Sequence, residues 1–175
     1  MKYENAKLRI VSLLEATRRN GIRHVIDFLG NSLFFDIGCH RHHQYAGGLA
    51  DHSLGVYEAA LENNRSCDVN SIIITTLLHD LGDLQYKNFH GHGRKSVAIL
   101  MDLNFELKPE EYRAIRFHMS HRPSIEHQNE LHEFEMARKE PLWNLLHLCD
   151  IMDASGGSAV EKIQELKSRY ENMCK

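Results

Sequence analysis

The sequence lacks the marks of a secreted or membrane-bound protein. Its four cysteines form no CxxC pair and show no framework spacing, which argues against a disulfide scaffold. No apolar run approaches the roughly 18 residues of a membrane span, and the N-terminus does not resemble a signal peptide. The net charge of −3 gives no general attraction to nucleic acid or to an anionic membrane. We therefore expect a protein of the reducing cytoplasm, without membrane contact.

Aromatic residues are also scarce, at 8% of the chain, whereas histidine occurs thirteen times among its 175 residues. Histidine is the commonest metal ligand among the side chains. The placement of these histidines in the predicted elements therefore becomes the main question about function.

Apolar residues recur at helical spacing along most of the chain, and no stretch alternates as a strand would. The pattern predicts helices over residues 3–19, 22–29, 49–64, 71–82, 92–103, 109–118, 130–140, 141–154 and 158–170, with Ser158 capping the last. Residues 34–45 and 83–91 are expected to be loops, and residues 121–129 show no assignable order. We predict one all-α domain, in which N-terminal helices of residues 1–30 pack on a core formed by residues 31–175.

The stretch from residue 71 to residue 83 carries the strongest signal. It is apolar on every side, which indicates a buried helix, yet it ends in His79 and Asp80 before Gly82 offers a stop. An ionised carboxylate in a core costs several kcal/mol unless it is paired or coordinates a metal. The pair therefore requires a partner elsewhere in the chain.

Four further polar residues occupy apolar stripes or helix ends: His52, His92, His118 and Asp150. With His79 and Asp80 they come from five predicted helices, and packing the apolar faces inward would bring all six towards one interior point. Imidazole and carboxylate together suit Fe, Mn, Zn, Co or Ni, whereas a closed structural zinc site usually includes thiolates.

Each of these residues has an ordinary explanation when it is taken alone. His52 fits a hydrogen-bonded core histidine, His92 a helix cap and His118 a charge at a helix end. Asp150 fits an ion pair with Arg113 or Arg116. The occurrence of the pattern on five helices at once favours a shared metal centre.

The same residues resemble the HD-domain metal-dependent phosphohydrolases. That superfamily is defined by the order His, His-Asp, Asp, found here as His52 in GGLADHS, His79-Asp80 in LLHDLG and Asp150 in LHLCD. The resemblance covers about residues 34–155 and implies an HD-type helical bundle. It is nearest to small bacterial and phage HD proteins, and more distant from HD-type 3′-to-5′ exoribonuclease domains.

The resemblance also implies a ligand set for one or two divalent transition metal ions. The first ion would be held by His52, His79, Asp80 and Asp150. Asp80 would bridge to a second ion held by His92 and His118, which look like the second-metal ligands of dinuclear members. One departure is Asp83, where many dinuclear members carry a lysine. Lys87 is the residue that we expect to take its place.

The implied activity is hydrolysis of a phosphate ester by a metal-activated water, as a phosphomonoesterase or phosphodiesterase. The substrate would be a small phosphorylated molecule such as a nucleotide or a short RNA. Asp80, Lys87 and His121 are the expected catalytic residues, His121 by protonating the leaving group. Arg94, Lys95 and His43 are the expected phosphate contacts.

Two other functions are compatible with the same residues. Inositol-oxygenase-like HD proteins share the ligand order but use two irons and O₂ in place of water. A non-catalytic, metal-stabilised binding module would retain the fold without a reaction. An apolar face on the first or last helix would also allow a dimer.

Overall fold

The chain folds as a helical domain in a computed structural model, which describes residues 2–39, 41–84, 91–124 and 127–175. None of these residues lies in a strand, which confirms the all-α prediction. The elements are α1 (Lys2–Ala16), α2 (Ile22–Asn31), α3 (Gly48–Asn63), α4 (Val69–Leu78), the 3₁₀ turn η1 (Leu81–Leu84), α5 (His92–Asp102), α6 (Pro109–Phe117), α7 (Gln128–Ala137), α8 (Pro141–Ala154) and α9 (Val160–Met173). Within the described part of the chain, no helix is long and apolar enough to cross a membrane.

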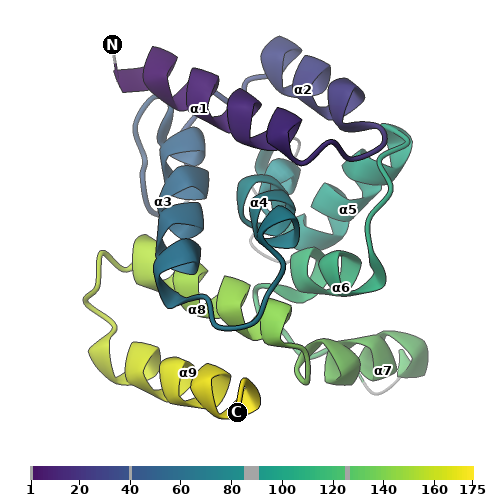
Figure 1. The fold of residues 1–175 in the computed structure, drawn as a ribbon, viewed down its shortest axis with the longest axis vertical. Helices are drawn as coiled ribbons and strands as arrows, with labels where there is room; N and C mark the ends of the chain where they lie inside the picture. Colours follow the sequence, from purple (N-terminus) through teal and green to yellow (C-terminus); the bar gives the residue numbers. More distant parts are fainter. Residues whose placement is uncertain (1, 40, 85–90, 125–126) are drawn as a thin grey trace.

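Helix α4 occupies the centre of the molecule, with α3, α6, α8 and α1 around it (Figure 1). Asp68 caps its N-terminus by accepting a hydrogen bond from the backbone N–H of Ser71, at 3.1 Å. Every residue from Ser71 to Leu78 is buried, as expected for a helix without a polar face. The end of α4 therefore delivers His79 and Asp80 into the interior.

The N-terminal helices cover one side of this core. Helix α1 contacts α2, α3 and α4, and its side chains Ile10 and Leu14 are fully buried. The segment after α1 is tied to α6 by Arg19, whose guanidinium donates two hydrogen bonds, of 2.8 and 2.9 Å, to the carboxylate of Glu111. Glu111 is itself buried and also accepts from Ser71. This partly buried ion pair links the segment after α1 to α4 and α6.

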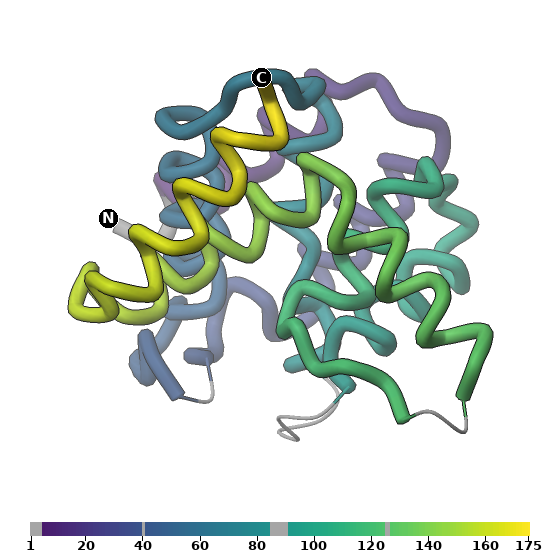
Figure 2. The backbone as a smooth tube through the Cα atoms, turned by 90° about the horizontal axis from the view of Figure 1, so that it is seen from below, coloured from purple at the N-terminus to yellow at the C-terminus, as the bar shows by residue number. Residues whose placement is uncertain are grey.

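The last two helices form the opposite side. Pro141 begins α8, which packs against α3, α6 and α9, and Figure 2 shows α9 running beside α8. One local prediction was wrong: Ala159, not Ser158, is the N-cap of α9. The Ser158 hydroxyl instead donates to the carbonyl of Ser155 at 2.7 Å, because residues 155–158 form a turn in which the backbone N–H of Ser158 also donates to that carbonyl.

Candidate metal centre

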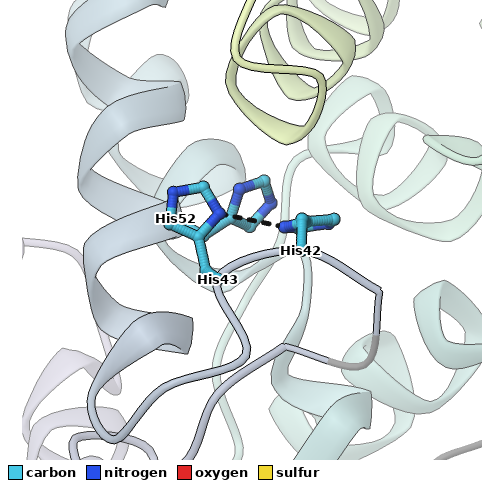
Figure 3. Close-up of side chains that lie close together, drawn as sticks. All are labelled: His42, His43 and His52. Atoms are coloured by element: carbon cyan, nitrogen blue, oxygen red, sulfur yellow. Dashed lines mark hydrogen bonds between the residues drawn. The ribbon is translucent and has the colours of Figure 1, made fainter.

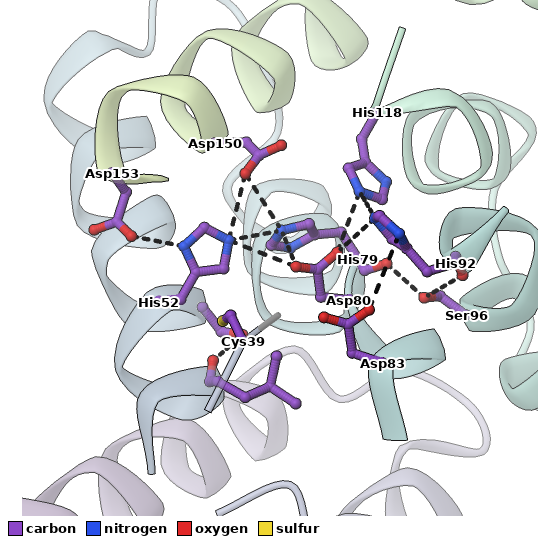
Figure 4. Close-up of polar contacts among 12 residues, drawn as sticks. Cys39, His52, His79, Asp80, Asp83, His92, Ser96, His118, Asp150 and Asp153 are labelled. Carbon is purple, nitrogen blue, oxygen red and sulfur yellow. Dashed lines mark hydrogen bonds and ion pairs between the residues drawn. The ribbon is translucent and has the colours of Figure 1, made fainter. Parts of the chain in front are cut away.

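The six polar side chains singled out on the predicted helices meet in one place (Figure 4). They come from the first half of α3, the C-terminus of α4, the N-terminus of α5, the C-terminus of α6 and the second half of α8. All six are buried, with exposed fractions between 0% and 8%. They are His52, His79, Asp80, His92, His118 and Asp150. The structure therefore joins five segments of the sequence in one cluster.

One half of the cluster lies between α3, α4 and α8. The Nε2 atom of His52 is 3.3 Å from Nε2 of His79 and 3.3 Å from Oδ1 of Asp150. The Oδ2 atom of Asp80 lies 3.6 Å from Nε2 of His52 and 3.5 Å from Nε2 of His79. These spacings are close to those between neighbouring ligand atoms that each lie about 2.1 Å from one ion.

The other half lies between α4, α5 and α6. The Nε2 atoms of His92 and His118 are 2.8 Å apart, and each is 3.2 Å from Oδ1 of Asp80. The two carboxylate oxygens of Asp80 thus face different halves of the cluster. Asp80 is the side chain placed to contact both.

Contacts on the outer ring nitrogens set the orientation of the imidazoles. Nδ1 of His79 lies 2.9 Å from the carbonyl of Thr76, and Nδ1 of His118 lies 2.7 Å from the carbonyl of Ile115. A carbonyl only accepts hydrogen bonds, so Nδ1 carries the proton in both rings. In the neutral rings the lone pair of Nε2 then points into the cluster, which is the ligand form of histidine.

A third imidazole is oriented by a carboxylate. Nδ1 of His52 donates to Oδ2 of Asp153 at 2.6 Å, so the neutral ring presents its Nε2 lone pair to that of His79 at 3.3 Å. Facing lone pairs repel each other unless a proton or a metal ion lies between them, and the raised pKa of His52 means that a proton takes this place when no metal is bound. Among the described residues, Oδ1 of Asp80 is buried without a hydrogen-bond donor. Both observations fit a cluster that holds a cation.

The electrostatics of the cluster agree with this interpretation. Burial alone would lower the pKa of His52, but the carboxylates of Asp150 and Asp153 outweigh it and raise the pKa to about 10. Burial dominates at His79 and lowers its pKa to about 4. At Asp80 burial is outweighed by the neighbouring imidazoles, which hold its pKa well below the ordinary value. The centre therefore carries negative charge that favours a cation.

A family model of the HD domain matches residues 49–155, well over half of the chain. The chain belongs to the HD domain family. It is thus a member of the HD superfamily of metal-dependent phosphohydrolases, and the expected resemblance is confirmed. No solved structure matches the chain. HD domains bind divalent metal ions, and the buried cluster of this HD domain can hold metal.

Of the expected phosphate contacts of the HD domain, Arg94 and Lys95 follow His92 in the first turn of α5, and His43 lies beside His52 and Asp153. Arg94 is 61% exposed and forms an ion pair with Glu130 at 2.6 Å, and Lys95 beside it is half-buried. His43 is half-buried, with its Nε2 atom 3.5 Å from Oδ2 of Asp153. Lys87 falls outside the described residues.

His121, the expected proton donor to the leaving group, is exposed and lines a cavity of about 190 Å³. Arg94, Arg116 and Arg122 line the same cavity. Its wall also includes the neighbours of His92 and His118 along the chain, namely Gly91, Gly93, Phe117 and Met119. The cavity therefore adjoins the half of the cluster formed by α5 and α6.

Sequence reasoning did not assign a role to three residues that contact the cluster. Asp153 and His147 lie three residues after and three residues before Asp150, so helical spacing on α8 places them on the same face. The Nδ1 atom of His147 donates to the carbonyl of His118 at 2.7 Å. Asp83, noted only as a departure from the family pattern, has its Oδ1 4.0 Å from Nδ1 of His92. The i, i+3 spacing on α8 was the available signal.

We expect His147 to make the stability of the metal-free protein fall as the pH is lowered. Burial lowers its pKa from 6.5 to about 4. Between these values the unfolded chain binds the proton and the folded chain does not. Its contribution to stability is therefore complete above pH 6.5 and is lost as the pH falls towards 4, by about 3 kcal/mol in the free energy of unfolding. We expect His147→Asn, which keeps a donor for the His118 carbonyl, to reduce this loss in urea denaturation at each pH.

The matched control is His132→Asn, at an exposed position of α7. Its stability is expected to change with pH as that of the original protein does. If the His147→Asn and original proteins lost equal stability between pH 6.5 and 4, His147 would not be a buried neutral imidazole.

Proposed function

We propose that this HD domain is a hydrolase of phosphate esters, a phosphomonoesterase or phosphodiesterase that acts on a nucleotide or a short RNA. The observation that supports it best is the double arrangement around Asp80. One carboxylate oxygen faces His52 and His79, and the other faces His92 and His118. Such an arrangement suits two ions that share one bridging ligand, which is a recurrent device for phosphate chemistry.

The ligand roles follow from the two halves of the cluster. His52, His79 and Asp150 would hold one ion together with Oδ2 of Asp80. His92 and His118 would hold the other together with Oδ1 of Asp80. Divalent ions held by these residues would supply hydroxide at neutral pH and would neutralise charge on the attacking and leaving oxygens of the phosphate. The hydrogen bonds of the outer ring nitrogens keep the imidazoles aimed inward throughout the reaction.

Side chains at the rim would position the substrate. Arg94 and Lys95 lie in the first turn of α5, immediately after His92, and would contact the non-bridging oxygens of the phosphate. His121 lines the adjoining cavity and would protonate the leaving group. His43 would approach the phosphate from the side of α3. For Lys87 we retain the proposal that it takes the place of the lysine absent at position 83.

The proposal is tested on the purified protein loaded with Mn²⁺ or Fe²⁺. We expect metal-dependent release of phosphate or nucleotide from at least one of the mononucleotides, cyclic nucleotides, short RNAs and aryl phosphates. A chelator should stop it and added metal should restore it. Oxygen uptake that depends on an organic substrate, with a mixed-valent iron signal, would instead identify an oxygenase. A protein that is fully loaded with metal and catalyses neither reaction would instead be a non-catalytic binding module.

A further inference from the structure

Two histidines of the loop before α3 lie beside the central cluster and belong to neither of its halves. The Nδ1 atoms of His42 and His43 are 3.1 Å apart (Figure 3). The ring of His42 also packs on that of His52, with 4.4 Å between the ring centroids. Both side chains are half-buried, so they lie between the cluster and the solvent. The sequence placed His43 near a phosphate but did not predict this pairing.

The backbone around His43 is held in a costly conformation. Its φ of +46° lies in the left-handed region, which costs a residue with a side chain roughly 1–2 kcal/mol. Its carbonyl oxygen would lie 1.9 Å from a Cβ atom at Gly48 and 2.6 Å from one at Gly38. Both glycines are therefore needed to admit this turn. Strained backbone that the surroundings enforce so closely is typical of functional sites.

The carboxylate of Asp153 orients this pair as well as the central cluster. The oxygen that accepts the hydrogen bond from His52 also lies 3.5 Å from Nε2 of His43. A proton held on Nε2 by this carboxylate leaves the lone pair of His43 on Nδ1, directed at Nδ1 of His42. A carboxylate behind the ring is the usual support for a metal-binding histidine. His43 thus has the tautomer and the support that metal binding requires, and an ion would take the place of the proton that lies between the two Nδ1 atoms.

From this geometry we propose that Nδ1 of His42 and Nδ1 of His43 bind a further divalent cation that favours imidazole, such as Zn²⁺, Co²⁺ or Ni²⁺. The separation of 3.1 Å suits two adjacent ligands at about 2.1 Å from one ion. His52 cannot be a third ligand, because its Nε2 faces the central cluster and its Nδ1 is bound to Asp153. The remaining positions are open to water or to an oxygen of a substrate phosphate, so His43 would contact the phosphate through this ion, a role that rests on the proposed function.

The test compares the number of ions bound per chain. Protein depleted of metal is dialysed against increasing Zn²⁺ or Co²⁺, and the bound metal is measured by elemental analysis. We expect His42→Ala/His43→Ala to bind one ion fewer than the original chain and to keep the ions of the central cluster. Each single variant should weaken the same ion about 10-fold or more. The matched control is His127→Ala/His132→Ala, two exposed histidines, which should bind as the original does.

Two outcomes would overturn the proposal. An unchanged number and affinity of ions in the double variant would show that the pair is only hydrogen-bonded. Loss of every ion would show that the pair supports the central cluster and has no ion of its own. Neither outcome depends on catalysis, so a failure of the proposed hydrolysis, seen in the substrate screen, remains distinguishable. The single variants keep the test valid if the double variant does not fold.

Discussion

Replacing Asp80 by asparagine is expected to remove the ions of the central cluster and to lower phosphoester hydrolysis by about 10³-fold or more. The amide has nearly the same shape but no charge, and it presents an oxygen to only one half of the cluster. Its NH₂ group would point at the other half, where Asp80 contacts the Nε2 atoms of His92 and His118 at 3.2 Å. Metal content by elemental analysis and kcat on the best substrate are the two measurements.

The control for this substitution is Asp102→Asn, at an exposed position at the end of α5. It makes the same chemical change outside the cluster and should leave metal content and kcat unaltered. Circular dichroism should show that the Asp80→Asn variant is folded, since the amide fits the same volume. A folded variant that retained its ions and its rate would remove Asp80 from the centre of the mechanism.

The cluster residues could be predicted from the sequence because burying a charged or polar side chain is costly. His79 and Asp80 end a helix without a polar face, so their burial is evident from residues 71–83 alone, and the structure buries both. His52, His92 and His118 could be placed because helical spacing aligns them with apolar neighbours. For the same reason most predicted helix boundaries agree with the structure to within a few residues.

The contacts that depend on tertiary packing could not be predicted in this way. Arg94 lies only two residues after His92, yet its guanidinium pairs with Glu130, 36 positions further along the chain. The nitrogen contact between His42 and His43 requires the left-handed turn at His43, which is possible only because Gly38 and Gly48 approach its carbonyl. Helical periodicity carries no information about a loop of this kind.

The groups that orient the imidazoles show a further reason why some contacts of the site could be predicted from the sequence and others could not. Two of the imidazoles are oriented by backbone carbonyls of their own helix, those of Thr76 and Ile115, three residues earlier in each case. Any helical residue provides such a carbonyl, so no side chain marks it in the sequence. The supporting side chains on α8 differ in this respect: Asp153, which orients His52 across the fold, and His147, which donates to the carbonyl of His118, both stand at helical spacing from Asp150.

Gly82→Ala is expected to lower the free energy of unfolding by about 3 kcal/mol, near the upper end of overpacking effects. The added Cβ atom would lie 2.2 Å from the carbonyl oxygen of His92, and 2.8 and 2.9 Å from its carbonyl carbon and Cα. All three are backbone atoms, which cannot turn away as a side chain can. The same clash pushes the first turn of α5 away from Asp80, so affinity for an ion between Asp80, His92 and His118 should fall about 10- to 100-fold. Urea denaturation without metal and a metal titration measure the two effects.

Gly30→Ala is the matched control, because Gly30 lies inside α2 and an added Cβ atom there meets no atom within 4 Å. Alanine favours a helix over glycine by about 0.5–1 kcal/mol, so this variant should be as stable as the original or slightly more stable. The contrast separates the loss of glycine itself from the loss of close contact with His92. If both variants were equally stable, the close packing of α5 on η1 would not require glycine at position 82. The position of His92 would then have to be explained by other contacts.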